Sequence, residues 1–262
     1  MTDEQLLEII AQAAKDRVRF LDLMDCKLTA LPKEIGQLTS LTELYLGNNQ
    51  LTSLPPEISQ LRELTELSLY NNQLGVLPKE ICHLSKLYSL DLGSNQLQTL
   101  PAEIGKLSNI SVLYLGNNQL KTLPASIGKL RNLTELYLRY NQLTTLPAEI
   151  GQLSNLSDLA LGSNQLTRVP ASIGQLSQLS VLYLDHNQLT TVPETISQLR
   201  NLMVLYLNHN QLTVIPAGIC QLMNQLDDVN LEGNPLTSLP LEITNKGNKH
   251  IVEYLRQQLH PC

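Results

Sequence analysis

The sequence predicts an α/β solenoid, a row of about ten similar coils that each carry one parallel strand and one short helical turn. Nine prolines recur at intervals of 23 residues and a tenth follows after 24, at Pro32, Pro55, Pro78, Pro101, Pro124, Pro147, Pro170, Pro193, Pro216 and Pro240. Asparagines recur in the same register, at Asn49, Asn72, Asn95, Asn118, Asn141, Asn164, Asn187, Asn210 and Asn234. A fixed period of this length is the signature of a repeat architecture, in which each unit packs against its neighbours.

Alternating leucines predict the strand of each coil. In the stretch LTELYLGNNQLTSLP, Leu44 and Leu46 are expected to point inward and the residues between them outward, as in a half-exposed strand. The strands are expected to begin at Val18, Leu41, Leu64, Leu87, Ile110, Leu133, Leu156, Leu179, Leu202 and Leu226. Stacked coils would then place about ten strands in one concave parallel β-sheet.

The rest of each coil is predicted to turn back on the convex side. The Asn49 carboxamide can bond backbone groups of adjacent coils, which leucine side chains cannot do. Pro55 suits the first turn of a helix, because its φ angle is preset and it needs no N–H there. Ile58 and Leu61 fall on one helical face, and only a short helix or a 3₁₀ turn fits before the next strand. One additional residue, in LMNQL at 222–226, lies on the connection before the last strand.

Both ends of a solenoid expose core and need caps. Residues 1–17 are predicted to form an N-terminal capping helix, with a capping box at Thr2 and Gln5 and an apolar stripe at Leu6, Leu7, Ile10 and Ala14. Residues 244–262 are predicted to form a C-terminal capping helix and tail, with Ile251, Leu255 and Leu259 at helical spacing. With the repeats in residues 18–243, the chain is predicted to be one continuous domain.

Composition narrows the functional classes. The 262 residues carry a formal net charge of −6, which argues against general affinity for nucleic acid or anionic membrane. The chain begins without the basic segment of a secretory signal and has no apolar run approaching the ~20 residues of a membrane span, so we expect a cytoplasmic protein. The four cysteines have no metal-binding spacing and are expected to be reduced thiols, with Cys82 and Cys220 buried.

Tyrosines gather at the positions that should face outward from the strands. Eight of the nine tyrosines lie there: Tyr45, Tyr70, Tyr88, Tyr114, Tyr137, Tyr140, Tyr183 and Tyr206. Amphipathic aromatic side chains are the usual anchors of protein interfaces, so the concave face is predicted to bind a protein. The pairs Tyr114/Tyr137 and Tyr183/Tyr206 are expected to pack together. The alternative is that tyrosine only suits an exposed strand.

Acidic residues gather on the same predicted face. Eleven are expected there, at Asp22, Asp25, Glu43, Glu66, Asp91, Glu135, Asp158, Asp185, Asp227, Asp228 and Glu232, against Arg19 and Arg139. The resulting charge of −9 would attract a partner with a basic patch, and salt should weaken the attraction. The alternative is that these carboxylates only keep the sheet soluble.

An apolar patch is predicted among the later strands. Val112, Val181, Met203 and Val204 stand where other repeats carry polar residues, and with Tyr183 and Tyr206 they would form an exposed contact site. We expect the strongest contribution to binding from this region.

The sequence offers little catalytic chemistry. His186 and His209 occupy equivalent positions in adjacent coils, near Asp185 and Glu232, and are a candidate metal pair without a fixed third ligand. The alternative reading is two ordinary contact histidines. No phosphate-binding loop, nucleophile elbow or zinc-protease motif occurs. We therefore predict a non-enzymatic protein without a cofactor.

The repeated pattern LPxxIxxLxxLxxLxLxxNxL resembles the 23-residue leucine-rich repeats of Ras-binding and Ras-suppressor-type proteins. This resemblance implies a leucine-rich repeat horseshoe. The flanks TDEQLLEIIAQAAKD and NPLTSLPLEITNKGNKHIVEYLRQQL are similar to the boundaries of the repeat domain in Roco proteins, where the repeats precede a Ras-like GTPase domain. The resemblance implies a signalling protein that is either a stand-alone relative or a repeat segment of a longer chain, and it adds an alternative function as regulator or sensor of a small GTPase.

Overall fold

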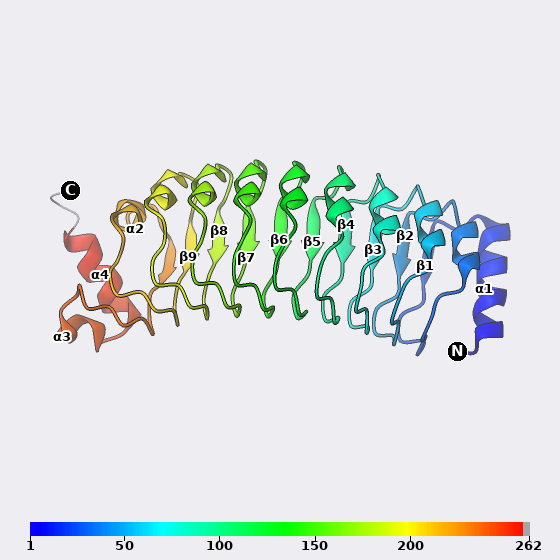
Figure 1. Cartoon of the computed structure of the whole chain (residues 1–262), viewed down its shortest axis with the longest axis horizontal. Helices are drawn as coiled ribbons and strands as arrows, with labels where there is room; N and C mark the ends of the chain where they lie inside the picture. The colour runs from blue at the N-terminus through cyan, green and yellow to red at the C-terminus, as the bar shows by residue number, and fades with distance from the viewer. Residues whose placement is uncertain (259–262) are drawn as a thin grey trace.

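Ten parallel strands form one continuous sheet. The structure is a computed structural model that describes residues 1–258. Within that range the strands are β1 (Phe20–Asp22), β2 (Glu43–Tyr45), β3 (Glu66–Ser68), β4 (Ser89–Asp91), β5 (Val112–Tyr114), β6 (Glu135–Tyr137), β7 (Asp158–Ala160), β8 (Val181–Tyr183), β9 (Val204–Tyr206) and β10 (Asp228–Asn230). They pair in sequence order, which confirms the predicted solenoid (Figure 1).

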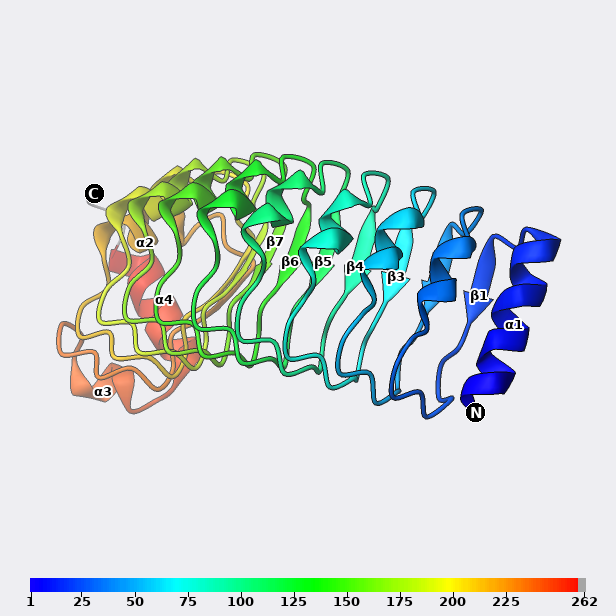
Figure 2. The ribbon, with the colours of Figure 1, turned by 45° about the vertical axis from the view of Figure 1, so that its right-hand side comes forward.

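Short helical turns form a second row, across each coil from the strands (Figures 1 and 2). The 3₁₀ turns are η1 (Lys33–Gln37), η2 (Pro56–Gln60), η3 (Lys79–His83), η4 (Ala102–Lys106), η5 (Ala125–Lys129), η6 (Ala148–Gln152), η7 (Ala171–Gln175) and η8 (Glu194–Gln198). The next coil instead carries the α-helix α2 (Ala217–Leu222), and the additional residue of the sequence lies just after it. A change in the convex connection therefore accommodates the insertion while the strand register continues into β10.

Two element boundaries differ from the sequence prediction. The repeat proline precedes the turn instead of beginning it, because Pro55 is extended (φ −69°, ψ 146°) and its carbonyl accepts the first 3₁₀ hydrogen bond from the Ile58 N–H at 3.0 Å. The strands also begin two residues later than predicted. The Leu41 N–H bonds within its own coil to the Leu38 carbonyl, so pairing with the preceding coil starts at Thr42.

The core is a continuous column of leucine and isoleucine. Leu44, Leu46, Ile58 and Leu61 are fully buried, as the alternation and helical spacing predict. The Cys82 thiol is also buried, and burial raises its pKa to about 12, which keeps it protonated. Cys220 is only half-buried, and Cys262 lies outside the described residues.

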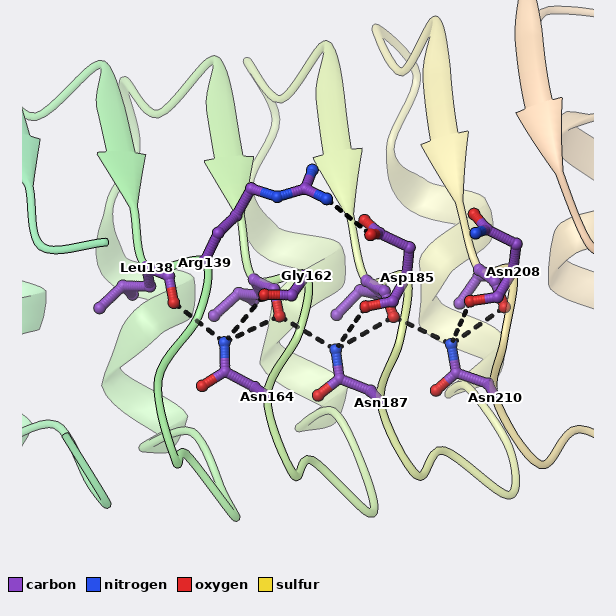
Figure 3. A network of polar contacts seen from close by, with 11 residues as sticks. Leu138, Arg139, Gly162, Asn164, Asp185, Asn187, Asn208 and Asn210 are labelled. Atoms are coloured by element: carbon purple, nitrogen blue, oxygen red, sulfur yellow. Dashed lines mark hydrogen bonds and ion pairs between the residues drawn. The ribbon is translucent and has the colours of Figure 1, made fainter. Parts of the chain in front are cut away.

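The repeated asparagines form a ladder of hydrogen bonds along the solenoid (Figure 3). The Asn164 Nδ2 donates to the carbonyls of Leu138 (2.9 Å) and Leu161 (3.0 Å), and its Oδ1 accepts the Leu143 N–H (3.0 Å). The same bonds recur at the asparagines before and after it, for example at Asn141 and Asn187. Each carboxamide thus satisfies buried backbone groups in two neighbouring coils, which confirms its predicted structural role.

The N-terminal helix α1 (Asp3–Asp16) covers the first coil. It begins with the predicted capping box, in which the Gln5 N–H donates to the Thr2 Oγ1 and the Thr2 N–H donates to the Gln5 Oε1. The buried face consists of Leu6, Ile10 and Ala13. The predicted inclusion of Leu7 was wrong, because it lies to the side of this stripe and is exposed.

Two further helices, α3 (Leu241–Thr244) and α4 (Asn248–Gln258), follow the last strand. Ile251 and Leu255 are buried as predicted, whereas Leu259 lies outside the described residues. Asn248 receives the Leu231 N–H on its Oδ1 and donates to the Val229 carbonyl, so it satisfies the open edge of β10. This contact was not predicted, because Asn248 lies outside the 23-residue register.

Candidate protein-binding surface

The candidate site is the concave face, formed by the strand side chains that point away from the leucine core. The last residues of β2 to β9 lie side by side in the register of the sheet, and we call them the tyrosine row: Tyr45, Ser68, Asp91, Tyr114, Tyr137, Ala160, Tyr183 and Tyr206. Adjacent strands lie about 4.8 Å apart, a spacing at which aromatic side chains of neighbouring coils touch.

Aromatic pairs order the tyrosine row. The Tyr114 and Tyr137 rings are stacked at 4.9 Å between centroids, and the Tyr183 and Tyr206 rings meet edge to face at 5.1 Å. Both predicted pairs are therefore confirmed. Phe20 also meets Tyr45 edge to face at 5.4 Å, a contact that was not predicted. Such pairs contribute about 0.5–1.5 kcal/mol beyond simple burial, so they hold the rings in place.

Carboxylates next to the row accept hydrogen bonds from its phenols. The Tyr137 hydroxyl donates to Glu135 Oε2 at 2.9 Å, the Tyr45 hydroxyl donates to Glu43 at 3.3 Å, and Tyr206 donates to Asp228. Burial, followed by the hydrogen bond with Glu66, raises the Tyr45 pKa to about 12. For Tyr206 the hydrogen bond to Asp228 is the main cause of a pKa of about 12. Burial and Glu135 also raise the pKa of Tyr137. The phenols are thus donors near neutral pH.

The three other predicted tyrosines, Tyr70, Tyr88 and Tyr140, lie beside the row and are exposed. Tyr140 belongs to a series of residues with φ between 52° and 57°, one before each repeat asparagine from Asn49 to Asn210, which also includes Asn48, Asn71, Ser94, Asn117, Ser163, His186 and His209. Asparagine and histidine are comparatively frequent in this left-handed region, whereas a bulky tyrosine there is strained. Exposing the Tyr140 side chain at this position therefore requires a strained backbone conformation.

His186 and His209 stack with their ring centroids 4.4 Å apart and their planes 19° from parallel. Their predicted adjacency is confirmed. Across residues 1–258, however, no group of three His, Cys, Asp or Glu side chains is arranged to hold a metal ion. The pair consequently presents two exposed imidazoles on the concave face, without the geometry of a metal centre.

The acidic residues of the concave face are mostly left without ion pairs. Asp185 is the only one of the eleven in an ion pair within the described chain. Several others accept neutral hydrogen bonds, as Asp158 does from the Ser157 hydroxyl at 2.6 Å and Asp91 from the Gly93 N–H at 2.9 Å. Burial raises the pKa of Asp91 in spite of the Gly93 bond. The face therefore keeps a large uncompensated negative charge.

Arg139 makes the one ion pair that this face has among residues 1–258, and the pair was not predicted. Its guanidinium donates to Asp185 Oδ2 at 2.7 Å, from a coil two repeats away (Figure 3). The same group lies 5.5 Å from the Tyr183 ring centroid and 6.0 Å from that of Tyr140, within cation–π range. Gly162 in the coil between them leaves the space, since a Cβ atom there would lie 2.6 Å from Asp185 Oδ1. The sequence signal for this contact is that Arg139 and Asp185 lie 46 residues apart in the same repeat position, with Gly162 halfway between them.

The predicted apolar patch is smaller than expected. Val181 and Val204 are neighbours in the sheet, and Met203 beside them is exposed. Val112 does not belong to this patch, because Glu135 and Asp158 lie between it and Val181 in the same register. Strand spacing therefore separates Val112 from the other three.

Comparison with known proteins identifies the family. A family model described as a leucine-rich repeat region matches residues 16–94 and 71–165, which together make up more than half of the chain. The chain belongs to the leucine-rich repeat family. A second leucine-rich repeat model matches residues 178–236. No curated protein matches the chain. None of the helices within residues 1–258 has the length and hydropathy that a membrane-spanning segment needs.

Several solved leucine-rich repeat structures resemble this one. A leucine-rich repeat protein from Leptospira interrogans has 43% sequence identity and a TM-score of 0.70, over 88% of this chain and 65% of its own. The functional domain of InlJ from Listeria monocytogenes has 27% identity and a TM-score of 0.73, over 87% of this chain and 47% of its own. A chain of the Toll–Spatzle complex of Drosophila has 32% identity and a TM-score of 0.67, over 73% of this chain and 26% of its own. This chain thus spans less than two thirds of each.

Proposed function

We propose that this protein binds a partner protein through the tyrosine row and the carboxylates around it. The observation that carries the proposal is the gathering of ordered tyrosines and unpaired carboxylates on one face. Tyrosine rings held by their neighbours lose little conformational freedom on binding, and such rigid aromatic side chains are typical interface anchors. Leucine-rich repeat proteins commonly mediate protein–protein contacts, and one similar structure is the Toll–Spatzle complex.

The chemistry of the face favours a partner with basic side chains. Carboxylates without ion pairs raise the local concentration of cationic groups and accelerate their association, and added salt weakens both effects. The partner is expected to present a basic patch to the concave face.

A small Ras-like GTPase is a more specific candidate partner. The supporting observation is the resemblance of the two flanking segments to the boundaries of the Roco repeat domain. The test passes purified GTPases, loaded with either GDP or GTP, over the immobilised protein. We expect one nucleotide state of a GTPase to be retained more than the other. Equal lack of retention in both states counts against this candidate while leaving protein binding in general intact.

Replacing Tyr137, Tyr183 and Tyr206 together with alanine is expected to reduce capture of a partner from source lysate at least tenfold. Alanine is a residue that this position accepts, as Ala160 shows in β7. Quantitative mass spectrometry measures capture, and circular dichroism checks that the variant stays folded. The matched control replaces Lys106, Lys129 and Gln175 with alanine, all exposed at the ends of turns on the convex side. Unchanged capture by the tyrosine variant, or an equal loss in the control, contradicts the proposal.

A further inference from the structure

The tyrosine row is interrupted at two places, and the two gaps differ. Ala160 interrupts it between Tyr137 and Tyr183, and Ser68 with Asp91 interrupts it between Tyr45 and Tyr114. A small residue in a row of large ones leaves room above the sheet, so each gap is a place where another group can lie.

The protein holds a cation of its own beside the first gap. Arg139 crosses the coil of Ala160 at Gly162, two residues beyond Ala160, lies over the Tyr183 ring at 5.5 Å and donates to Asp185 at 2.7 Å. Ala160, between Tyr137 and Tyr183 in the register, is only 2% exposed. The concave face thus shows how it holds a guanidinium group, with an aromatic ring beneath the group and a carboxylate at its edge.

The second gap has the same chemistry but no cation. It is a hollow of about 280 Å³ whose lining includes Tyr45, Ser68, Ser89 and Tyr114, together with the carboxylates of Glu66 and Asp91. This volume lies below the ~300–1,000 Å³ of drug-sized ligand sites and suits one amino-acid side chain. Neither carboxylate makes an ion pair within residues 1–258.

The two carboxylates are placed for a planar group between them. In the sheet register Glu66 lies beside Ser89 and Asp91 lies beside Ser68, so the carboxylates stand at diagonal positions of β3 and β4. The serines between them are small. A guanidinium group has N–H donors on both edges of one plane and can therefore reach two separate carboxylates, whereas an ammonium group is a single point charge. Burial already raises the pKa of Asp91, so a neighbouring cation would favour its ionised form.

We propose that this open gap binds one arginine side chain of the partner protein, with its stem against the tyrosine rings and its guanidinium group between Glu66 and Asp91. The assignment rests on the proposed function, since it names the chemistry of one contact on the same face. It places a specific arginine contact in the N-terminal half of the tyrosine row, away from Tyr183 and Tyr206.

The test uses N-acetyl-arginine N-methylamide as the probe and follows tyrosine ring signals by NMR. Shifts are expected for Tyr45 and Tyr114, saturating in the millimolar range and weakening at least threefold on addition of 0.5 M salt, since exposed ion pairs and cation–π contacts are individually weak. The equivalent capped citrulline, which lacks the charge, should give no saturating shift. Equal binding of citrulline, or tighter binding of capped lysine than of capped arginine, overturns the assignment.

Variants locate the site. Glu66→Gln and Asp91→Asn together should weaken the probe about tenfold, whereas Glu149→Gln on the convex turn η6 should leave it unchanged. Ser68→Tyr places a tyrosine in the gap and fills the hollow, so it is expected to abolish the shifts in a folded protein. Probe binding that survives Ser68→Tyr overturns the pocket. If partner capture is lost in the Tyr137, Tyr183 and Tyr206 variant but is undiminished by Ser68→Tyr, the protein-binding function stands and the arginine pocket fails.

Discussion

Replacing Asn164 with alanine is expected to lower the free energy of unfolding by about 3–5 kcal/mol, because the change strands buried backbone groups in two coils. The Leu143 N–H loses its acceptor, and the carbonyls of Leu138 and Leu161 lose a donor. Alanine cannot replace these bonds, and the enclosed position excludes water. Urea unfolding followed by circular dichroism measures the change, and the midpoint should fall markedly.

Asn155→Ala provides the matched control for the ladder. Asn155 also donates its Nδ2 to a backbone carbonyl, that of Arg131 at 2.9 Å, but it does so on the exposed surface where water can take over. Its replacement should change the free energy of unfolding by no more than about 0.5 kcal/mol. A similar effect of the two substitutions would show that the buried ladder does not hold the coils together.

Replacing Arg139 with methionine is expected to destabilise the protein by about 2–3 kcal/mol, because it leaves the Asp185 carboxylate without its cation. The Asp185 side chain is only 5% exposed, and its Oδ1 has no hydrogen-bond partner among the described residues. The expected loss is smaller than for a fully enclosed pair, since the Arg139 side chain is 34% exposed and water weakens its interaction. Methionine keeps the apolar stem, so the change isolates the charge. Urea unfolding gives the magnitude.

A double variant distinguishes a buried charge from lost packing. Glycine stands at the Asp185 position in other coils, at Gly93, Gly116 and Gly162, so Asp185→Gly removes the carboxylate without introducing a foreign residue. Arg139→Met combined with Asp185→Gly should be more stable than Arg139→Met alone, a non-additive result. If the two losses simply add, Arg139 and Asp185 are not coupled and the ion pair contributes little.

Periodicity was sufficient to predict the coils. The repeat asparagines from Asn49 to Asn234 and the buried leucines of the strands could be assigned from the repeat register, because each repeat meets the same neighbours. The same register placed the tyrosines side by side, and it predicted two of the three aromatic pairs among them. The contact of Phe20 was not predicted, because Phe20 lies opposite Glu43 in the register and meets Tyr45 only diagonally.

Contacts that occur in only one coil, and do not recur with the repeat, were harder to predict. Arg139 reaches Asp185 over an intervening coil, and its partner depends on the missing Cβ atom of Gly162. Asn248 continues the ladder from a capping helix, where no repeat position specifies it. Val112 was grouped with Val181 by residue type, although two acidic coils separate them. Periodicity describes what repeats, whereas these contacts arise where one coil differs from the next.

The positions of each coil are of two kinds, those that repeat along the chain and those that vary. Leucine, asparagine and proline keep the coils alike, and the outward strand residues vary without disturbing them. The strained Tyr140, the Arg139 contact and the interrupted tyrosine row all belong to the variable set. The face that we propose as the binding surface therefore differs from coil to coil, while the buried leucine positions stay the same.

Carboxylate footprinting of the protein bound to its captured partner tests the concave-face assignment most directly. Water-soluble carbodiimide labelling, read by mass spectrometry, compares acidic residues of the two sides with and without the partner. We expect Glu66, Asp158 and Asp228 to become protected in the complex, while Glu57, Glu103 and Glu149 on the convex turns stay equally reactive. Protection of the convex glutamates with unchanged labelling of the concave carboxylates would contradict the assignment.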